Sequence, residues 1–172
     1  LGSKFGAQAQ YTIHTDLAGG NPADYLYFYN DNFYSWHGTN SFITDRKFRD
    51  PSAWYHFVYV YDSTQAVASE RLRLYVNGIR ETSFSTENYP SLNATSYFNT
   101  NTAHYIGGAN TSSSRLDAYM AEIHFLDGLA YDPSFFGEFN DSGIWIPKEY
   151  TGSYGSNGFK IDGRDSSDLG DD

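Results

Sequence analysis

Two stretches of the chain carry the pattern of β-strands most clearly. Residues 54–63, WYHFVYVYDS, are almost all aromatic or β-branched, and residues 71–78, RLRLYVNG, alternate apolar with polar or amphipathic side chains. A period of two residues is typical of a half-buried strand. Asn77 and Gly78, at the end of the second stretch, both tolerate the positive φ of a tight hairpin turn. The pattern predicts two neighbouring antiparallel strands, which need further strands around them.

Short runs of the same character recur at intervals typical of a β-sandwich. They predict strands over residues 9–15, 25–29, 33–37, 41–44, 104–108 and 118–128. In the first of these, strict alternation places Tyr11 and Ile13 on one face and Thr12 and His14 on the other. Residues 83–102 lack a clean period and are predicted to form a long surface loop.

Composition supports an all-β fold with very little helix. Aromatic residues make up 19% of the 172 positions, and aromatic side chains are enriched in strands. Asp132 and Pro133 are suited to cap and begin one short helical turn. We expect a two-sheet antiparallel β-sandwich over residues 1–161. Residues 162–172 are predicted to be an acidic linker.

Charge and cysteine content exclude several classes of function. The net charge is −10 with only 11 Lys and Arg, whereas binding to nucleic acid phosphates requires a clustered basic face. There are no cysteines, which excludes disulfides, thiol catalysis and cysteine-ligated zinc. No apolar run approaches the roughly 20 residues that cross a bilayer. We therefore expect no nucleic acid partner and no membrane insertion.

Four segments, taken in order, resemble the laminin G-like, concanavalin A-like lectin/glucanase jelly-roll domains. They are WYHFV at 54–58, RLYVNG at 73–78, YIGG at 105–108 and AEIHFLDG at 121–128. A narrower likeness, to the version of this domain in structural proteins of phages and other viruses, rests on DPSFFGE at 132–138, WIPK at 145–148 and the aromatic, glycine-rich run at 150–159. The resemblance implies a concanavalin A-like jelly roll and a binding role. Because the family usually has one or two strands before the position of Leu1, it also implies a sandwich that is either incomplete at its N-terminal strand or completed by residues outside this chain.

Lectins of this kind stack pyranose rings on aromatic side chains and bind hydroxyls through polar ones. The candidate carbohydrate-binding residues are Tyr27, Tyr29, Tyr34, Trp36 and Asn110. The alternative is that these rings cover the faces of the sandwich and pack on one another, with their polar ends in water.

The family often binds Ca²⁺ through carboxylates and carbonyl oxygens. Asp117, Asp127 and Asp132 are the candidate ligands by their nearness to the later strands, although they form no diagnostic pattern, and no cofactor is required. Glycoside hydrolases of related folds need two paired carboxylates, whereas the strand at 121–125 offers only Glu122. We therefore expect that the protein is not an enzyme, with a glycoside hydrolase as the less favoured alternative.

The expected function is a non-enzymatic structural protein of a virion surface, in a tail fibre, a spike or a capsid decoration. The resemblance implies that it binds host-surface glycans, that it contacts other virion proteins as a homo-oligomer, and that it is extracellular. The alternative is a secreted or cell-surface adhesion module that binds carbohydrate or protein with the help of Ca²⁺.

Overall fold

The computed structural model describes residues 8–16, 24–109 and 114–164. The chain divides after Asp117 into two compact units, residues 1–117 and residues 118–172, and each is described here by itself. The expected boundary between a sandwich and a linker at residue 161 stays a prediction.

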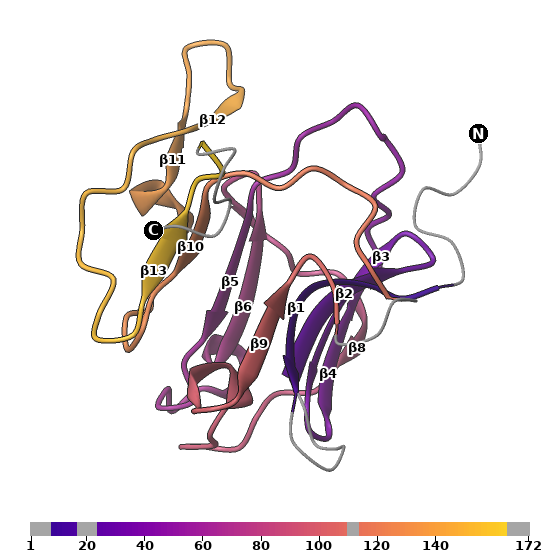
Figure 1. Ribbon diagram of the computed structural model, residues 1–172, viewed down its shortest axis with the longest axis vertical. Helices are drawn as coiled ribbons and strands as arrows, with labels where there is room; N and C mark the ends of the chain where they lie inside the picture. The colour runs from indigo at the N-terminus through magenta and orange to yellow at the C-terminus, as the bar shows by residue number, and fades with distance from the viewer. Residues whose placement is uncertain (1–7, 17–23, 110–113, 165–172) are drawn as a thin grey trace. The chain divides into compact units, whose positions relative to one another are not determined.

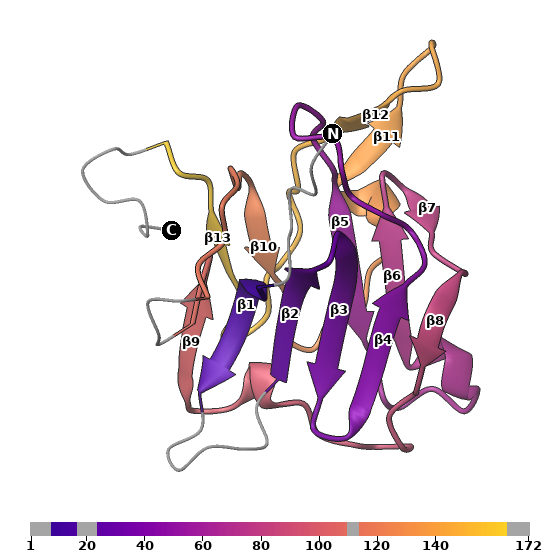
Figure 2. The ribbon, with the colours of Figure 1, turned by 90° about the vertical axis from the view of Figure 1, so that its right-hand side faces the viewer.

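The first unit contains a six-stranded antiparallel sheet, in which the strands lie in a row (Figures 1 and 2). Their order across the sheet is β8 (Phe84–Glu87), β4 (Asn40–Thr44), β3 (Asn32–His37), β2 (Asp24–Tyr29), β1 (Gln10–Asp16) and β9 (Ala103–Ile106). The strands predicted at 25–29, 33–37 and 41–44 are therefore confirmed as three consecutive neighbours. The prediction that residues 83–102 form a long loop is wrong at residues 84–87, where the chain forms β8. The FSTE sequence of this strand is short and mostly polar, which gives a weak strand pattern but suits an edge strand.

A second sheet of the same unit consists of β5 (Phe57–Tyr61), β6 (Leu72–Val76) and β7 (Ile79–Arg80). β5 and β6 pair antiparallel from Phe57 opposite Val76 to Tyr61 opposite Leu72, which confirms the predicted strand pair. Asn77 and Gly78 have φ of 50° and 77° and form the tight turn into β7. β5 starts at Phe57, later than the predicted start at residue 54. Trp54 therefore lies before the strand, and it is 67% exposed.

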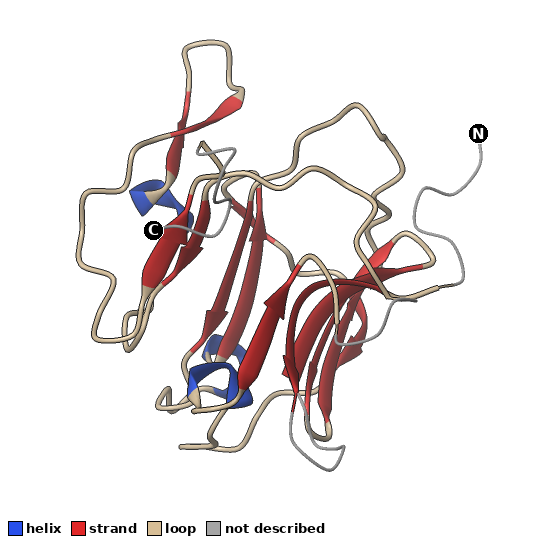
Figure 3. Cartoon of the chain, viewed as in Figure 1, coloured by secondary structure: helices blue, strands red, loops and turns tan. Residues whose placement is uncertain are grey.

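The core of the first unit lies between these two sheets. Leu26, Phe28 and Phe33 from the six-stranded sheet pack with Leu74 and Val76 from β6. Burying such side chains fully is worth about 1.5–3 kcal/mol each, which makes this layer the main source of stability. The expected all-β sandwich with antiparallel sheets is confirmed. The helical residues described are three short 3₁₀ turns, η1 (Ala68–Glu70), η2 (Tyr97–Asn99) and η3 (Pro133–Phe135) (Figure 3).

The second unit holds two short antiparallel sheets of two strands each. β10 (Ile123–Phe125) pairs with β13 (Phe159–Ile161), and β11 (Gly137–Phe139) pairs with β12 (Trp145–Pro147). The strand predicted over 118–128 is confirmed only at 123–125, because Glu122 has φ of 50° and extended backbone does not continue through it. Asp132 caps η3 as predicted, accepting from the Ser134 N–H at 2.8 Å. Among the described residues, no helix has the length and apolar character to cross a membrane.

Candidate functional site

Alternation along β2 and β3 gives the six-stranded sheet two unlike faces. Leu26, Phe28 and Phe33 point into the core, and the residues between them form the outer face. Four predicted carbohydrate-binding residues, Tyr27, Tyr29, Tyr34 and Trp36, all lie on this outer face, and each is half-buried. The fifth, Asn110, lies outside the described residues.

A β-bulge extends this aromatic face to β1. Tyr11 lies opposite Tyr27 and His14 lies opposite Tyr25, with a shift of register between Tyr11 and Ile13. The extra residue of the bulge breaks the strict period of two. The prediction that Tyr11 and His14 occupy opposite faces is therefore wrong, and both side chains join the outer face.

The outer rings stand in two rows across the strands. In one row His14 stacks on Tyr25 with a centroid distance of 5.5 Å and an angle of 11°, and Tyr25 stacks on Trp36 at 6.4 Å and 16°. In the other row the ring centroid of Tyr27 lies 5.4 Å from that of Tyr11 and 4.8 Å from that of Tyr34. Rings stacked so closely leave no room for a sugar between them, so their edges, rather than the shared faces, are open.

Burial within these rows keeps the phenols protonated. It is the largest cause that raises the pKa of Tyr11, Tyr25, Tyr27 and Tyr34 above the usual value, most strongly for Tyr27. Burial also lowers the pKa of His14, and the nearby Asp16 partly opposes this shift. At neutral pH the rows are therefore an uncharged surface of aromatic rings and phenolic hydroxyls.

One end of this aromatic face opens into a cavity of about 530 Å³, which we call the rim cavity. Its walls come from the start of β2, the end of β3, the β3–β4 turn, the end of β5 and the segment before η2. The lining residues are Asp24, Tyr25, Trp36, His37, Gly38, Thr39, Asn40, Tyr61, Ala94, Thr95 and Tyr97. Rings and hydroxyl or amide groups thus meet in one concave site, which is the usual composition of a small-molecule site.

A buried polar chain runs beneath the rim cavity. Asp24 and His37 lie directly opposite each other in the β2–β3 register and are 1% and 5% exposed. His37 Nδ1 lies 2.9 Å from Asp24 Oδ2, at an angle poor for a hydrogen bond. His37 Nε2 hydrogen-bonds the Tyr59 hydroxyl. A carboxylate beside Nδ1 favours the tautomer with its proton there, so we assign the Tyr59 hydroxyl as the donor to Nε2.

Asp24 also anchors a wall of the cavity. Its Oδ2 accepts from the Ser96 hydroxyl and from the Tyr97 backbone N–H, each at 2.6 Å. The Thr15 hydroxyl holds the backbone of Asp24 in turn, by accepting from its N–H at 2.8 Å. One carboxylate therefore ties the segment that carries Thr95 and Tyr97 to the edge of the sheet.

Sequence reasoning passed over this acid and this histidine as site residues. Asp24 shares the core-facing parity of Leu26 and Phe28, and His37 shares that of Phe33. An acid and a histidine at core-facing positions of adjacent strands indicate a buried polar pair, since buried polar groups need partners. This pattern is visible in the sequence. The predicted strand at 25–29 begins one residue too late to include Asp24.

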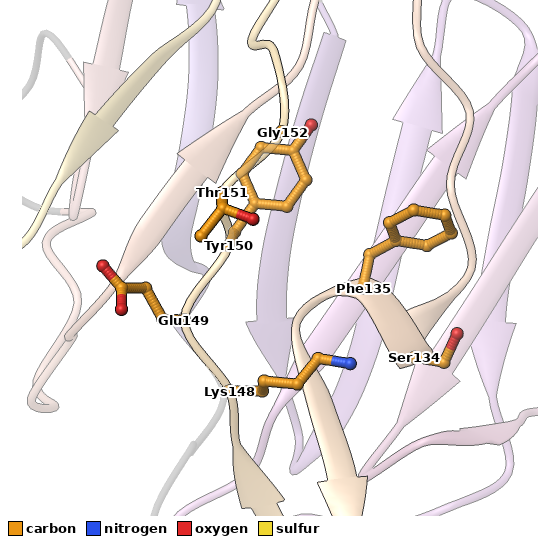
Figure 4. A pocket seen from close by; sticks show the side chains of 7 residues that line it. All are labelled: Ser134, Phe135, Lys148, Glu149, Tyr150, Thr151 and Gly152. Atoms are coloured by element: carbon orange, nitrogen blue, oxygen red, sulfur yellow. The ribbon is translucent and has the colours of Figure 1, made fainter.

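The second unit has a smaller cavity of about 350 Å³, shown in Figure 4. Phe135 and Tyr150 present rings on two sides of it, and the amino group of Lys148 points between the segments while Glu149 points away. One face of Phe135 is covered by Tyr131 at a centroid distance of 4.3 Å. The cavity holds fewer polar groups that converge than the rim cavity, so the rim cavity is the better candidate.

Of the three predicted Ca²⁺ ligands, Asp127 and Asp132 belong to the second unit and Asp117 to the first, and the Ca²⁺ site stays a prediction. Asp127 Oδ2 accepts from the side chain and the backbone of Asn157, at 2.7 and 3.2 Å, and Asp132 caps η3. Asp117 belongs to the first unit, where its backbone N–H donates to the Gln10 side chain. Within the described ranges, no group of three or more His, Asp or Glu side chains is placed to hold a metal ion.

Comparison with known protein families gives a match. The family model Laminin_G_3, described as the concanavalin A-like lectin/glucanases superfamily, matches residues 4–130. No curated protein and no solved structure matches the chain. The matched range includes every described strand of the first unit and therefore the whole wall of the rim cavity.

Proposed function

Since the chain belongs to the concanavalin A-like lectin/glucanases superfamily, we propose that it binds a saccharide in the rim cavity and does not cleave it. The observation that carries this proposal is the meeting of the Trp36 and Tyr25 rings with the polar side chains of Thr39, Asn40 and Thr95 in one cavity. An aromatic ring holds the C–H face of a pyranose, and hydroxyl and amide groups bind its hydroxyls.

Trp36 is the best-placed platform for a sugar. Tyr25 covers one face of the indole, and the residue opposite Trp36 on β4 is Ser41, whose side chain is small. The half-buried indole therefore meets a large neighbour on β2 and only a small one on β4. Tyr27 and Tyr34 stack on each other, so each ring covers one face of the other. Their role in binding is to hold the row of rings in place.

The polar chain below the cavity supports binding without catalysis. Of the described residues that line the cavity, only Asp24 carries a carboxylate, whereas retaining and inverting glycosidases both use a pair. Both nitrogens of His37 face protein groups, Asp24 and Tyr59. Ser96 donates to the carboxylate rather than to the imidazole, so this histidine does not activate it as a nucleophile.

Replacing Trp36 with alanine is expected to weaken saccharide binding by about tenfold or more, since a lost ring contact of roughly 1.4 kcal/mol is a factor of ten. A glycan array first identifies a ligand, and isothermal titration calorimetry then compares the variants. Trp54→Ala is the matched control, because this tryptophan is 67% exposed and does not line the cavity. Equal losses in both variants, or no binding by the wild type to any glycan, would contradict the proposal.

We further propose that the protein acts at a virion surface. Its ligands there are host glycans, and its neighbours are other virion proteins and further copies of the chain. This proposal rests on the likeness of residues 132–159 to the viral version of the domain. Mass spectrometry of purified particles is expected to detect the polypeptide in amounts typical of a structural protein. Its consistent absence from particles would favour the secreted adhesion module.

A further inference from the structure

The fixed charge in the walls of the rim cavity is negative. Among the described residues that line it there is no lysine and no arginine, and Asp24 is the one acid. The remaining polar groups include the imidazole of His37, whose two nitrogens face Asp24 and Tyr59. The others are the hydroxyl and amide groups of Tyr25, Thr39, Asn40, Tyr61, Thr95 and Tyr97. A carboxylate or sulfate on a ligand would find acceptors and hydroxyls here, with no cation to pair with.

From this arrangement we propose that the rim cavity selects an uncharged saccharide and excludes saccharides that carry a carboxylate or a sulfate. The inference rests on the carbohydrate-binding function proposed above and narrows its ligand class. A binding site rejects a competitor most effectively through an unpaired or repelled charge, so the selection comes from repulsion as well as from fit.

The negative charge of Asp24 acts on the cavity wall. The carboxylate is 1% exposed, and solvent screens a charge at such a position much less than one at the surface. Burial raises the pKa of Tyr61 to about 12, and the charge of Asp24 adds to this shift. The same charge contributes to the raised pKa of Tyr25. Two phenols that line the cavity thus already feel the field that an anionic ligand would meet.

Several cations of the first unit are engaged away from the cavity. Arg46 pairs with Glu81 at 2.6 Å, and Arg49 pairs with Asp31 at 2.9 Å. Arg71 donates to the backbone carbonyls of Gln65, Ala66 and Pro90. Moving any of these groups to an anionic ligand would break contacts that the fold already uses.

The test uses a glycan array of neutral oligosaccharides, each paired with its sialylated or sulfated derivative, followed by calorimetry on the best pair. The wild type is expected to bind the neutral member at least about tenfold more tightly. Thr39→Lys, which adds a cation at an exposed lining position, is expected to reduce that preference severalfold. Thr82→Lys, at an exposed position outside the cavity, is the matched control and should leave the preference unchanged.

The outcomes separate this inference from the function on which it rests. Equal binding to both members, or preference for the acidic one, overturns the inference and leaves carbohydrate binding standing. An unchanged preference in Thr39→Lys also overturns it, because charge at the cavity would then not set the selection. Failure to bind any glycan of either kind overturns both the inference and the proposed function.

Discussion

Replacing Asp24 with alanine is expected to lower the free energy of unfolding by about 2–6 kcal/mol, the cost of leaving two donors without their acceptor. The change removes the acceptor for Ser96 and Tyr97 and the charge beside His37. Each buried donor left without an acceptor costs about 1–3 kcal/mol. Urea denaturation of the full chain, followed by near-ultraviolet circular dichroism, measures the loss.

Two further variants make this result specific. Asp24→Asn keeps the size and one acceptor oxygen but loses the charge, so its stability should lie between those of the wild type and the alanine variant. Asp50→Ala removes an exposed acid of the same unit whose side chain bonds Ser52 two residues along the chain, and no comparable loss is expected. If Asp24→Ala were as stable as Asp50→Ala, the anchoring role of Asp24 would be wrong.

Alkaline unfolding is expected to begin above about pH 10 and to be steep. Tyr61 has its pKa raised to about 12, and the pKa values of Tyr11, Tyr25, Tyr27, Tyr34 and the buried Tyr59 are also raised. In the unfolded chain these phenols lose protons near pH 10. The unfolded state then binds fewer protons than the folded state, so stability falls as pH rises.

The stability that these phenols supply is present in full below pH 10 and is lost as pH rises through the folded-state values. Each unit of pKa shift corresponds to about 1.4 kcal/mol, and less for a ring that is partly exposed. Absorbance at 295 nm reports tyrosinate, and circular dichroism reports the sheets. Exposed tyrosines such as Tyr119 ionise near pH 10 without unfolding, and the further rise in absorbance should coincide with the loss of circular dichroism in one cooperative step.

The matched variants for this prediction remove one hydroxyl each. Tyr27→Phe, within the second row, is expected to move the alkaline midpoint upward, since one group that drives unfolding is gone. Tyr119→Phe alters a side chain that is 90% exposed and should leave the midpoint unchanged. A gradual titration of all tyrosines near pH 10 with the fold intact would contradict the burial of these rows.

Alternation, turn-forming residues and capping residues predicted the parts of the fold that depend on neighbours in the sequence. The β5–β6 pair, the Asn77–Gly78 turn and the Asp132 cap each depend on neighbouring residues or on a period of two, and each is confirmed. The same alternation located Tyr27, Tyr29, Tyr34 and Trp36 on adjacent strands. That these four side chains share one face follows from the register of β2 and β3 and was not predicted.

The rest of the site depends on contacts that no local pattern encodes. Asp24 meets Ser96 and Tyr97, more than 70 positions later in the chain, and Tyr59 reaches His37 from the other sheet. The bulge in β1 depends on how two strands align rather than on one strand. The cavity is therefore a product of register and of loop placement, and composition alone predicted only the kinds of residue that line it.

The bulge between Tyr11 and Ile13 sets how many rings this edge of the sheet carries. Tyr11 and His14 are three positions apart, so a regular strand of the same sequence would place them on opposite faces and give the outer rows only one of the two. Deletion of one residue between them would leave them two positions apart, and a regular strand would then hold both rings on the outer face. The aromatic edge therefore tolerates the loss of the extra residue, but not a regular pairing of the sequence that contains it.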